Sequence, residues 1–99
     1  MVKNLKFRLV DDKNQVLFEL AGQLEFNETN EFDEGELSFQ NPCSGDMYTD
    51  VKQCLMGWSE QNEADENARW ELAEAIAGDE ELLELAWCKE EGDVINYYR

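Results

Sequence analysis

The sequence contains no histidine, so it lacks the usual proton shuttle and the commonest metal ligand of proteins. Ser-His-Asp and Cys-His catalytic arrangements and the HExxH zinc motif are therefore excluded. No GxxxxGK[ST] or GxGxxG phosphate-binding motif occurs. Two carboxylates can form a glycosidase dyad, but among 24 acidic residues some pair always lies close, so this signal has no specificity. We expect a protein that is not an enzyme and uses no cofactor.

Cysteines and apolar runs are also few. The sequence has three cysteines, Cys43, Cys54 and Cys88. An odd number of cysteines without CxxC spacing fits neither a disulfide framework nor a zinc knuckle. The first ten residues contain no apolar signal-peptide core, and no apolar run approaches the length of a membrane span. We therefore expect reduced thiols, no membrane association and a cytoplasmic location.

Basic residues are scarce as well. Eight Lys and Arg stand against 24 Asp and Glu, for a net charge of −16, although a charge of roughly 2–8 in magnitude is enough to keep a small domain soluble. Residues 1–18 carry four basic and two acidic side chains, whereas residues 19–99 carry four basic and 22 acidic ones. This asymmetry favours an acidic face directed at a partner.

The chain nevertheless has the composition of a folded protein. Its hydrophobic fraction is 42% and its aromatic fraction is 11%, whereas acidic disordered tails are poor in aromatic residues. A chain of 99 residues can bury one core without disulfides or metals. We predict a single acidic domain of the α+β class that spans residues 1–99.

The N-terminal part predicts β-strands. Apolar residues alternate over 3–10 and again, at strict period 2, over 16–26. The second segment is either one long strand bent at Gly22 or two strands joined by a tight turn at Ala21-Gly22. A third strand is expected over 36–40. Because the connections are too short for parallel crossovers, we predict an antiparallel three-stranded meander.

The rest of the chain predicts two or three amphipathic helices. The first spans 47–61 with Asp46 as its N-cap, and the second spans 62–78. Residues 80–91 fit a third helix, but their alternation also fits one strand of a hairpin, and both interpretations stay open. Residues 94–98 are a candidate for a final strand.

Calcium is the natural ligand to test for an acidic loop. In an EF-hand, glycine occupies position six of the loop. Placing Gly35 there puts Phe32, which cannot ligate, at position three, and placing Gly92 there puts Trp87 at position one. We therefore expect no dedicated metal site.

The most unusual stretch is LEFNETNEFDEGELSF (24–39), which holds six carboxylates and no basic residue. Acidic residues also dominate 60–91, where like charges at helical spacing cost a few tenths of a kcal/mol per pair. We take the acidic side chains of both segments as candidate partner-binding residues: Glu25, Glu28, Glu31, Asp33, Glu34, Glu36, Glu63, Asp65, Glu66, Glu80, Glu81 and Glu84.

The expected spacing of these carboxylates suggests what they bind. Same-face residues recur at about 6.6 Å on a strand, and i and i+4 residues lie about 5–6 Å apart on a helix. Both values are near the separation of successive phosphates along a nucleic-acid strand. Apolar residues among them, such as Phe32, Trp70 or Tyr97, are candidate anchors.

In length, acidity, absence of histidine and absence of motifs, the sequence resembles small phage-encoded inhibitors of bacterial defence. This class includes anti-CRISPR and anti-restriction proteins, several of which are DNA mimics. The resemblance covers the composition and the acidic segments 25–36 and 60–91. It implies that the chain inhibits stoichiometrically by occupying a basic nucleic-acid-binding groove of a partner protein in the host cytoplasm, without itself binding nucleic acid.

Two other interpretations compete with this one. An acidic protein–protein interaction module, such as an adaptor or a toxin-neutralising partner, would bind through apolar residues and tolerate loss of the carboxylates. A small enzyme would require a pocket whose carboxylates have widely separated pKa values. The sequence does not indicate an oligomeric state.

Overall fold

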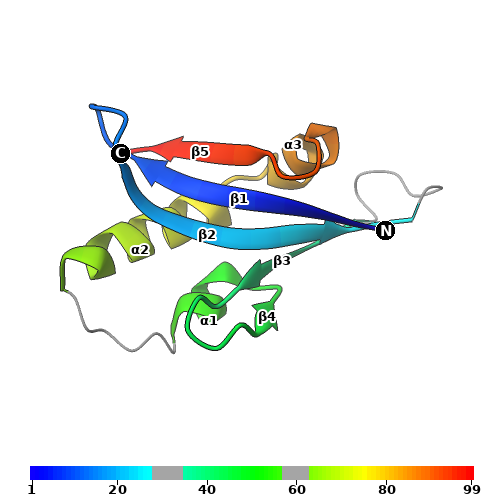
Figure 1. Cartoon of the computed structure of the whole chain (residues 1–99), viewed down its shortest axis with the longest axis horizontal. Coiled ribbons are helices and arrows are strands. Elements are labelled where there is room, and N and C mark those ends of the chain that lie inside the picture. Colours follow the sequence, from blue (N-terminus) through cyan, green and yellow to red (C-terminus); the bar gives the residue numbers. More distant parts are fainter. Residues whose placement is uncertain (28–34, 57–62) are drawn as a thin grey trace.

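The structure is a computed structural model that describes residues 1–27, 35–56 and 63–99, with the side chains of 63–66 outside the description. Figure 1 shows its elements. In chain order they are β1 (Val2–Val10), β2 (Val16–Glu25), β3 (Glu36–Gln40), β4 (Met47–Tyr48), α1 (Val51–Met56), α2 (Glu63–Ala77), α3 (Leu82–Cys88) and β5 (Val94–Tyr98).

The strands form one five-stranded mixed sheet in the order β4-β3-β2-β1-β5. Neighbouring strands are antiparallel except for β5, which runs parallel to β1. The predicted α+β class is confirmed, and the meander is confirmed only in part because β5 makes the sheet mixed. The prediction missed that the helical region after β4 supplies the long crossover that a parallel strand requires.

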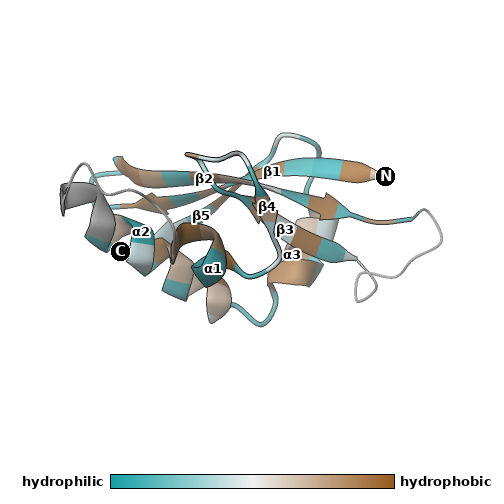
Figure 2. Cartoon of the chain, turned by 90° about the horizontal axis from the view of Figure 1, so that it is seen from below, coloured by the Kyte–Doolittle hydropathy of each residue, from teal (hydrophilic) through white to brown (hydrophobic). Residues whose placement is uncertain are grey.

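The three helices lie on one face of the sheet, and the other face is open to solvent (Figure 2). Side chains alternate between the two faces along each strand. Leu5 and Phe7 of β1, Leu20 and Leu24 of β2 and Leu72 of α2 are buried between the sheet and the helices. The open face carries the alternate residues of each strand, among them Lys6 and Glu19.

The segment 16–26 forms one strand, so the alternative of two strands with a turn at Ala21-Gly22 is wrong. Gly22 lies in the middle of β2 and pairs with Leu5 on one side and Phe39 on the other. The irregularity in the β1–β2 register lies between Leu9 and Val10 instead of at Gly22.

The prediction of a helix over 47–61 is wrong at its start. Met47 and Tyr48 form β4, and α1 begins at Val51. The carboxylate of Asp50 accepts hydrogen bonds from the backbone N–H groups of Lys52 (2.9 Å) and Gln53 (3.3 Å). Asp50, and not Asp46, therefore satisfies the first free donors of this helix. Residues 57–61 lie outside the described residues.

The predicted helix over 62–78 is found as α2 (Glu63–Ala77). Within the predicted segment 80–91, residues Leu82–Cys88 form the shorter helix α3, so the hairpin interpretation is wrong. Lys3 donates from Nζ to the carbonyl oxygens of Ala86 (3.2 Å) and Trp87 (2.7 Å), which places a cation at the C-terminus of α3, where it is favourable. The final strand over 94–98 is present as β5.

All three cysteines are free thiols. Cys54 is buried beneath the sheet, and this burial raises its pKa from 9.0 to about 11. Cys43 and Cys88 are exposed. Cys54 is thus a small core residue that stays protonated at neutral pH.

Candidate acidic interaction surface

The basic residues of the described chain are largely engaged within the fold. Arg8 donates from Nε to Glu19 Oε2 at 2.7 Å. Arg99 donates from Nε and Nη2 to the two carboxylate oxygens of Glu71 at 2.8 and 2.9 Å, and this contact raises the pKa of Arg99. Lys3 is engaged at the end of α3. These cations are therefore not free to neutralise the exposed carboxylates discussed below.

Glu25 and Glu36 lie directly opposite each other on β2 and β3. Both side chains are exposed and lie on the open face, because their neighbours Leu24 and Leu37 pair on the helix-covered face. No ion pair involves either carboxylate among the described residues. We call Glu25 and Glu36 the strand-end pair. Like charges placed directly opposite across two strands destabilise a sheet, so the strand-end pair is a stability defect of the isolated fold.

Replacing Glu36 by lysine is therefore expected to stabilise the protein by about 0.2–1 kcal/mol, because the new ammonium group would attract the carboxylate of Glu25 instead of repelling it. The measurement is the free energy of unfolding from urea denaturation at low and high salt, and the gain is expected to shrink as salt rises.

The matched control is Asp12→Lys, which makes the same change in net charge at an exposed turn position. If Asp12→Lys stabilises the protein as much as Glu36→Lys, the gain comes from lowering the net charge, and Glu25 and Glu36 do not repel each other specifically.

A second acidic group lies on the helix side, at the start of α3. Asp79 is half-buried and accepts hydrogen bonds from the Tyr97 hydroxyl (2.9 Å) and the Glu81 backbone N–H (3.1 Å). Burial and the adjacent Asp79 raise the pKa of Tyr97 above its ordinary value of 10.0. Asp79 and Tyr97 thus connect the α2–α3 turn to β5.

The carboxylates of Glu80, Glu81 and Glu84 around this turn are exposed. We call these three residues the α3 acidic group. Two of its members border a shallow surface hollow of about 430 Å³, which is lined by Asp79, Glu81, Glu84, Leu85 and Cys88. The hollow combines negative charge with the exposed Leu85, whose exposed fraction is 40%.

The remaining predicted residues lie elsewhere or outside the described part. Glu63, Asp65 and Glu66 lie in the first turns of α2. This end of α2 lies at the opposite end of the molecule from the N-terminus of β1 (Figure 1). The last group lies in a segment outside the described residues: Glu28, Glu31, Asp33 and Glu34.

The candidate residues therefore do not converge on one site. The sheet separates the strand-end pair on the open face from the α3 acidic group on the helix side, and the start of α2 lies at the far end. Of the proposed apolar anchors, Trp70 and Tyr97 are half-buried against the core, and Phe32 lies outside the described residues. Trp70 and Tyr97 therefore pack partly against the core and expose only part of each side chain.

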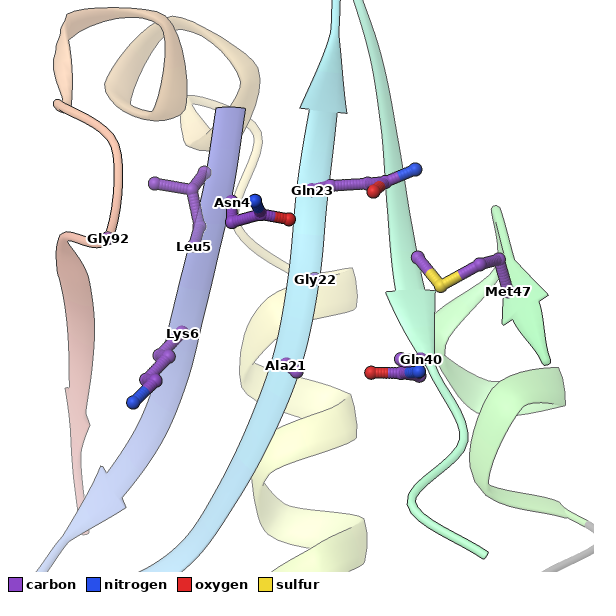
Figure 3. A pocket seen from close by; sticks show the side chains of 9 residues that line it. All are labelled: Asn4, Leu5, Lys6, Ala21, Gly22, Gln23, Gln40, Met47 and Gly92. Atoms are coloured by element: carbon purple, nitrogen blue, oxygen red, sulfur yellow. The ribbon is translucent and has the colours of Figure 1, made fainter. Parts of the chain in front are cut away.

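Sequence reasoning also missed a hollow on the open face, which Figure 3 shows from close by. Its volume is about 270 Å³. Ala21 and Gly22 of β2 form its floor, because they have little or no side chain. It is lined by Asn4, Leu5, Lys6, Ala21, Gly22, Gln23, Gln40, Met47 and Gly92. The alternation over 3–10 and 16–26, which separates the apolar residues from their neighbours on the other face, was the signal that could have found it.

Beside this hollow, Glu91 holds the beginning of the β5 segment against β1. Its carboxylate accepts hydrogen bonds from the backbone N–H (2.7 Å) and the side-chain Nδ2 (2.8 Å) of Asn4. These two bonds lower the pKa of Glu91. Glu91 therefore has a structural role. The residues that line the hollow are mostly uncharged.

No group of three or more His, Cys, Asp and Glu side chains suited to holding a metal ion is found in ranges 1–27, 35–56 and 63–99. Within the same described ranges, no helix combines the length and apolarity needed to cross a bilayer. Protein-family models, curated proteins and solved structures were compared with the chain, and none of them matches it.

Proposed function

We propose that this protein is a non-enzymatic inhibitor that occupies the basic nucleic-acid-binding groove of a bacterial defence complex, such as a CRISPR effector or a restriction enzyme. The observation that carries the proposal is the strand-end pair. Its two exposed carboxylates face each other with no ion-pair partner among the described residues. In the sequence, they flank four further acidic residues at positions 28–34.

An arrangement of charges that destabilises the free protein needs a compensating gain on binding. Opposed carboxylates cost stability when they face water, but they bind favourably to a surface that already holds cations for phosphates. Directly opposed residues of two antiparallel strands have Cβ atoms about 4.5–5.5 Å apart. A rigid sheet end with charges at this spacing can replace successive phosphates. It avoids the entropy cost of ordering that a flexible acidic tail would have on binding.

The net charge of the protein affects both the rate and the specificity of binding. A net charge of −16 produces a field that attracts a basic groove over several ångströms and accelerates the encounter. The same charge repels nucleic acid and anionic membranes, so neither is a direct ligand in this proposal. Salt shortens the range of the field, and binding is expected to weaken as salt rises.

The test is affinity capture from a bacterial lysate with the full chain immobilised. The expected result is a nucleic-acid-handling complex that is retained at low salt, released at raised salt and displaced by competing duplex DNA. A retained partner that is indifferent to both salt and DNA contradicts the proposal. An uncharged polymer is the control for the competing DNA. An unrelated acidic protein of similar charge, immobilised in the same way, is the control for the chain itself.

The second candidate function is an acidic protein–protein interaction module. The hollow beside α3 favours it, because Leu85 is exposed there among carboxylates. In this case binding would be lost on Leu85→Asp and would survive Glu25→Gln together with Glu36→Gln. The two variants thus separate the two functions on the same captured partner.

A further inference from the structure

The outer edge of β5 is the one long edge of the sheet that the described part of the chain leaves unpaired. The other edge strand, β4, has only two residues, Met47–Tyr48. Figure 1 shows β5 as the outermost strand beyond β1. Proteins normally protect such edges with charged residues, proline, a bulge or very short strands.

β5 has none of these protections. Its sequence, VINYY (94–98), contains no charge and no proline, although 32% of the chain is charged. Tyr98 is 71% exposed, more than any other large apolar side chain of the described residues. An unprotected, uncharged, aromatic edge in so acidic a protein is the pattern of an interface and not of a solvated edge.

The hydrogen bonding of β5 to β1 determines which backbone groups face outward. The Asp93 carbonyl accepts from Lys6 N–H (3.0 Å), and Arg99 N–H donates to the Val10 carbonyl (2.9 Å). Odd-numbered residues of this segment therefore direct their N–H and C=O groups to β1. The even-numbered residues, Val94, Asn96 and Tyr98, direct theirs to the free edge.

This free edge is complementary to itself. In an antiparallel pair centred on Asn96, each Asn96 faces Asn96 of the other copy, and Val94 faces Tyr98 in both directions. The outward N–H and C=O groups of all three residues would then be paired. The same register sets Asp93 opposite Arg99 at both ends. Arg99 keeps its contact with Glu71 through Nε and Nη2, so Asp93 of the other copy would approach a guanidinium group that is already paired on one side.

We propose that β5 is a homodimerisation edge: two copies of the chain pair antiparallel about Asn96 and join their sheets into one continuous sheet. The interface is isologous, as a two-fold symmetric dimer requires. A partner strand of arbitrary sequence would not be expected to match an edge that begins with an acidic residue and ends with a basic one. This dimer is independent of the proposed inhibitory function.

The test is the mass of the full chain in solution, measured by sedimentation equilibrium over a wide concentration range. The expected mass is that of two 11.5 kDa chains, falling to one on dilution. Because each copy carries a net charge of −16, added salt is expected to strengthen the dimer by screening repulsion. This salt response is opposite in sign to that expected for binding of a basic partner.

The decisive variant is Asn96→Asp. In the monomer its carboxylate would lie beside Arg8, the register partner of residue 96, so folding is not expected to suffer. In the dimer two carboxylates would meet across the two-fold axis, and the dissociation constant is expected to rise about tenfold or more. The matched control is Gln40→Glu, which adds the same charge to the open face away from β5 and should leave the dimer intact.

The proposal is overturned by a single-chain mass at every concentration, by open-ended assemblies, or by a dimer that Asn96→Asp and Gln40→Glu affect equally. Circular dichroism checks that each variant folds. Should Asn96→Asp fail to fold, Tyr98→Glu replaces it, because this side chain is already exposed in the monomer and faces Val94 of the other copy in the dimer. A Tyr98→Glu protein that dimerises like the wild type also overturns the proposal.

Discussion

Replacing Gly22 by alanine is expected to destabilise the fold by about 1–3 kcal/mol, although the change adds only one methyl group. A Cβ atom at this position would lie 2.6 Å from Cε2 of Phe7 and 2.7 Å from the backbone carbonyl oxygen of Ser38. Phe7 is fully buried, and Ser38 lies in the neighbouring strand β3. Neither contact can be relieved without moving the centre of the core or the strand beside it.

Urea denaturation measures this loss as a lower midpoint. The matched control is Ala21→Val, which adds methyl groups at the next position of β2 on the open face, where strand propensity favours valine. Ala21→Val is expected to be close to neutral. Combining Gly22→Ala with Phe7→Leu should cost less than the sum of the two single changes, because the smaller side chain removes one of the two clashes. Equal losses for Gly22→Ala and Ala21→Val would refute this account of Gly22.

The second large effect concerns binding. Neutralising both members of the strand-end pair, as Glu25→Gln with Glu36→Gln, is expected to weaken capture of the proposed basic partner about tenfold. Extending the change to the four acidic residues at positions 28–34 should bring the loss to about a hundredfold. The salt dependence of binding should become shallower at each step, because fewer counterions of the partner are displaced.

The matched control for the pair is Glu80→Gln with Glu81→Gln, which removes the same charge from the α3 acidic group on the helix side. This control should leave affinity nearly unchanged. The strand-end variant is expected to fold at least as stably as the wild type, so that lost binding cannot be ascribed to unfolding. Equal losses in both double variants would mean that overall charge, and not the sheet end, attracts the partner.

Local patterns predicted the strands well because the period of a strand is a property of neighbouring residues. Alternation placed β1, β2 and β3 within one residue of their observed ends. The start of α1 was missed because Asp46 and Asp50 are equally good caps by residue type, and only the pairing of Met47 with Gln40 decides between them. The parallel position of β5 has no local signal, since its partner β1 lies at the other end of the chain.

The acidic surface was predictable in composition but not in arrangement. That Glu25, Glu36 and Glu84 are exposed follows from their charge. Only the β2–β3 register shows that Glu25 and Glu36 lie opposite each other. Only the placement of α3 shows that Glu84 lies on the other side of the sheet. The structural role of Tyr97 could not be predicted from local sequence, because it depends on a hydrogen bond from its hydroxyl to Asp79, which lies in a different segment of the chain.

The position of β1 between β2 and β5 also has a consequence for biosynthesis. β1 is made first, yet its second edge stays uncovered until the ribosome has released residues 94–98. Throughout elongation, the strand that carries Leu5 and Phe7 can pair on one side only. Contacts between such distant segments slow folding and prolong the life of aggregation-prone intermediates. We therefore expect the nascent chain, and not the finished protein, to be the form that most depends on chaperones.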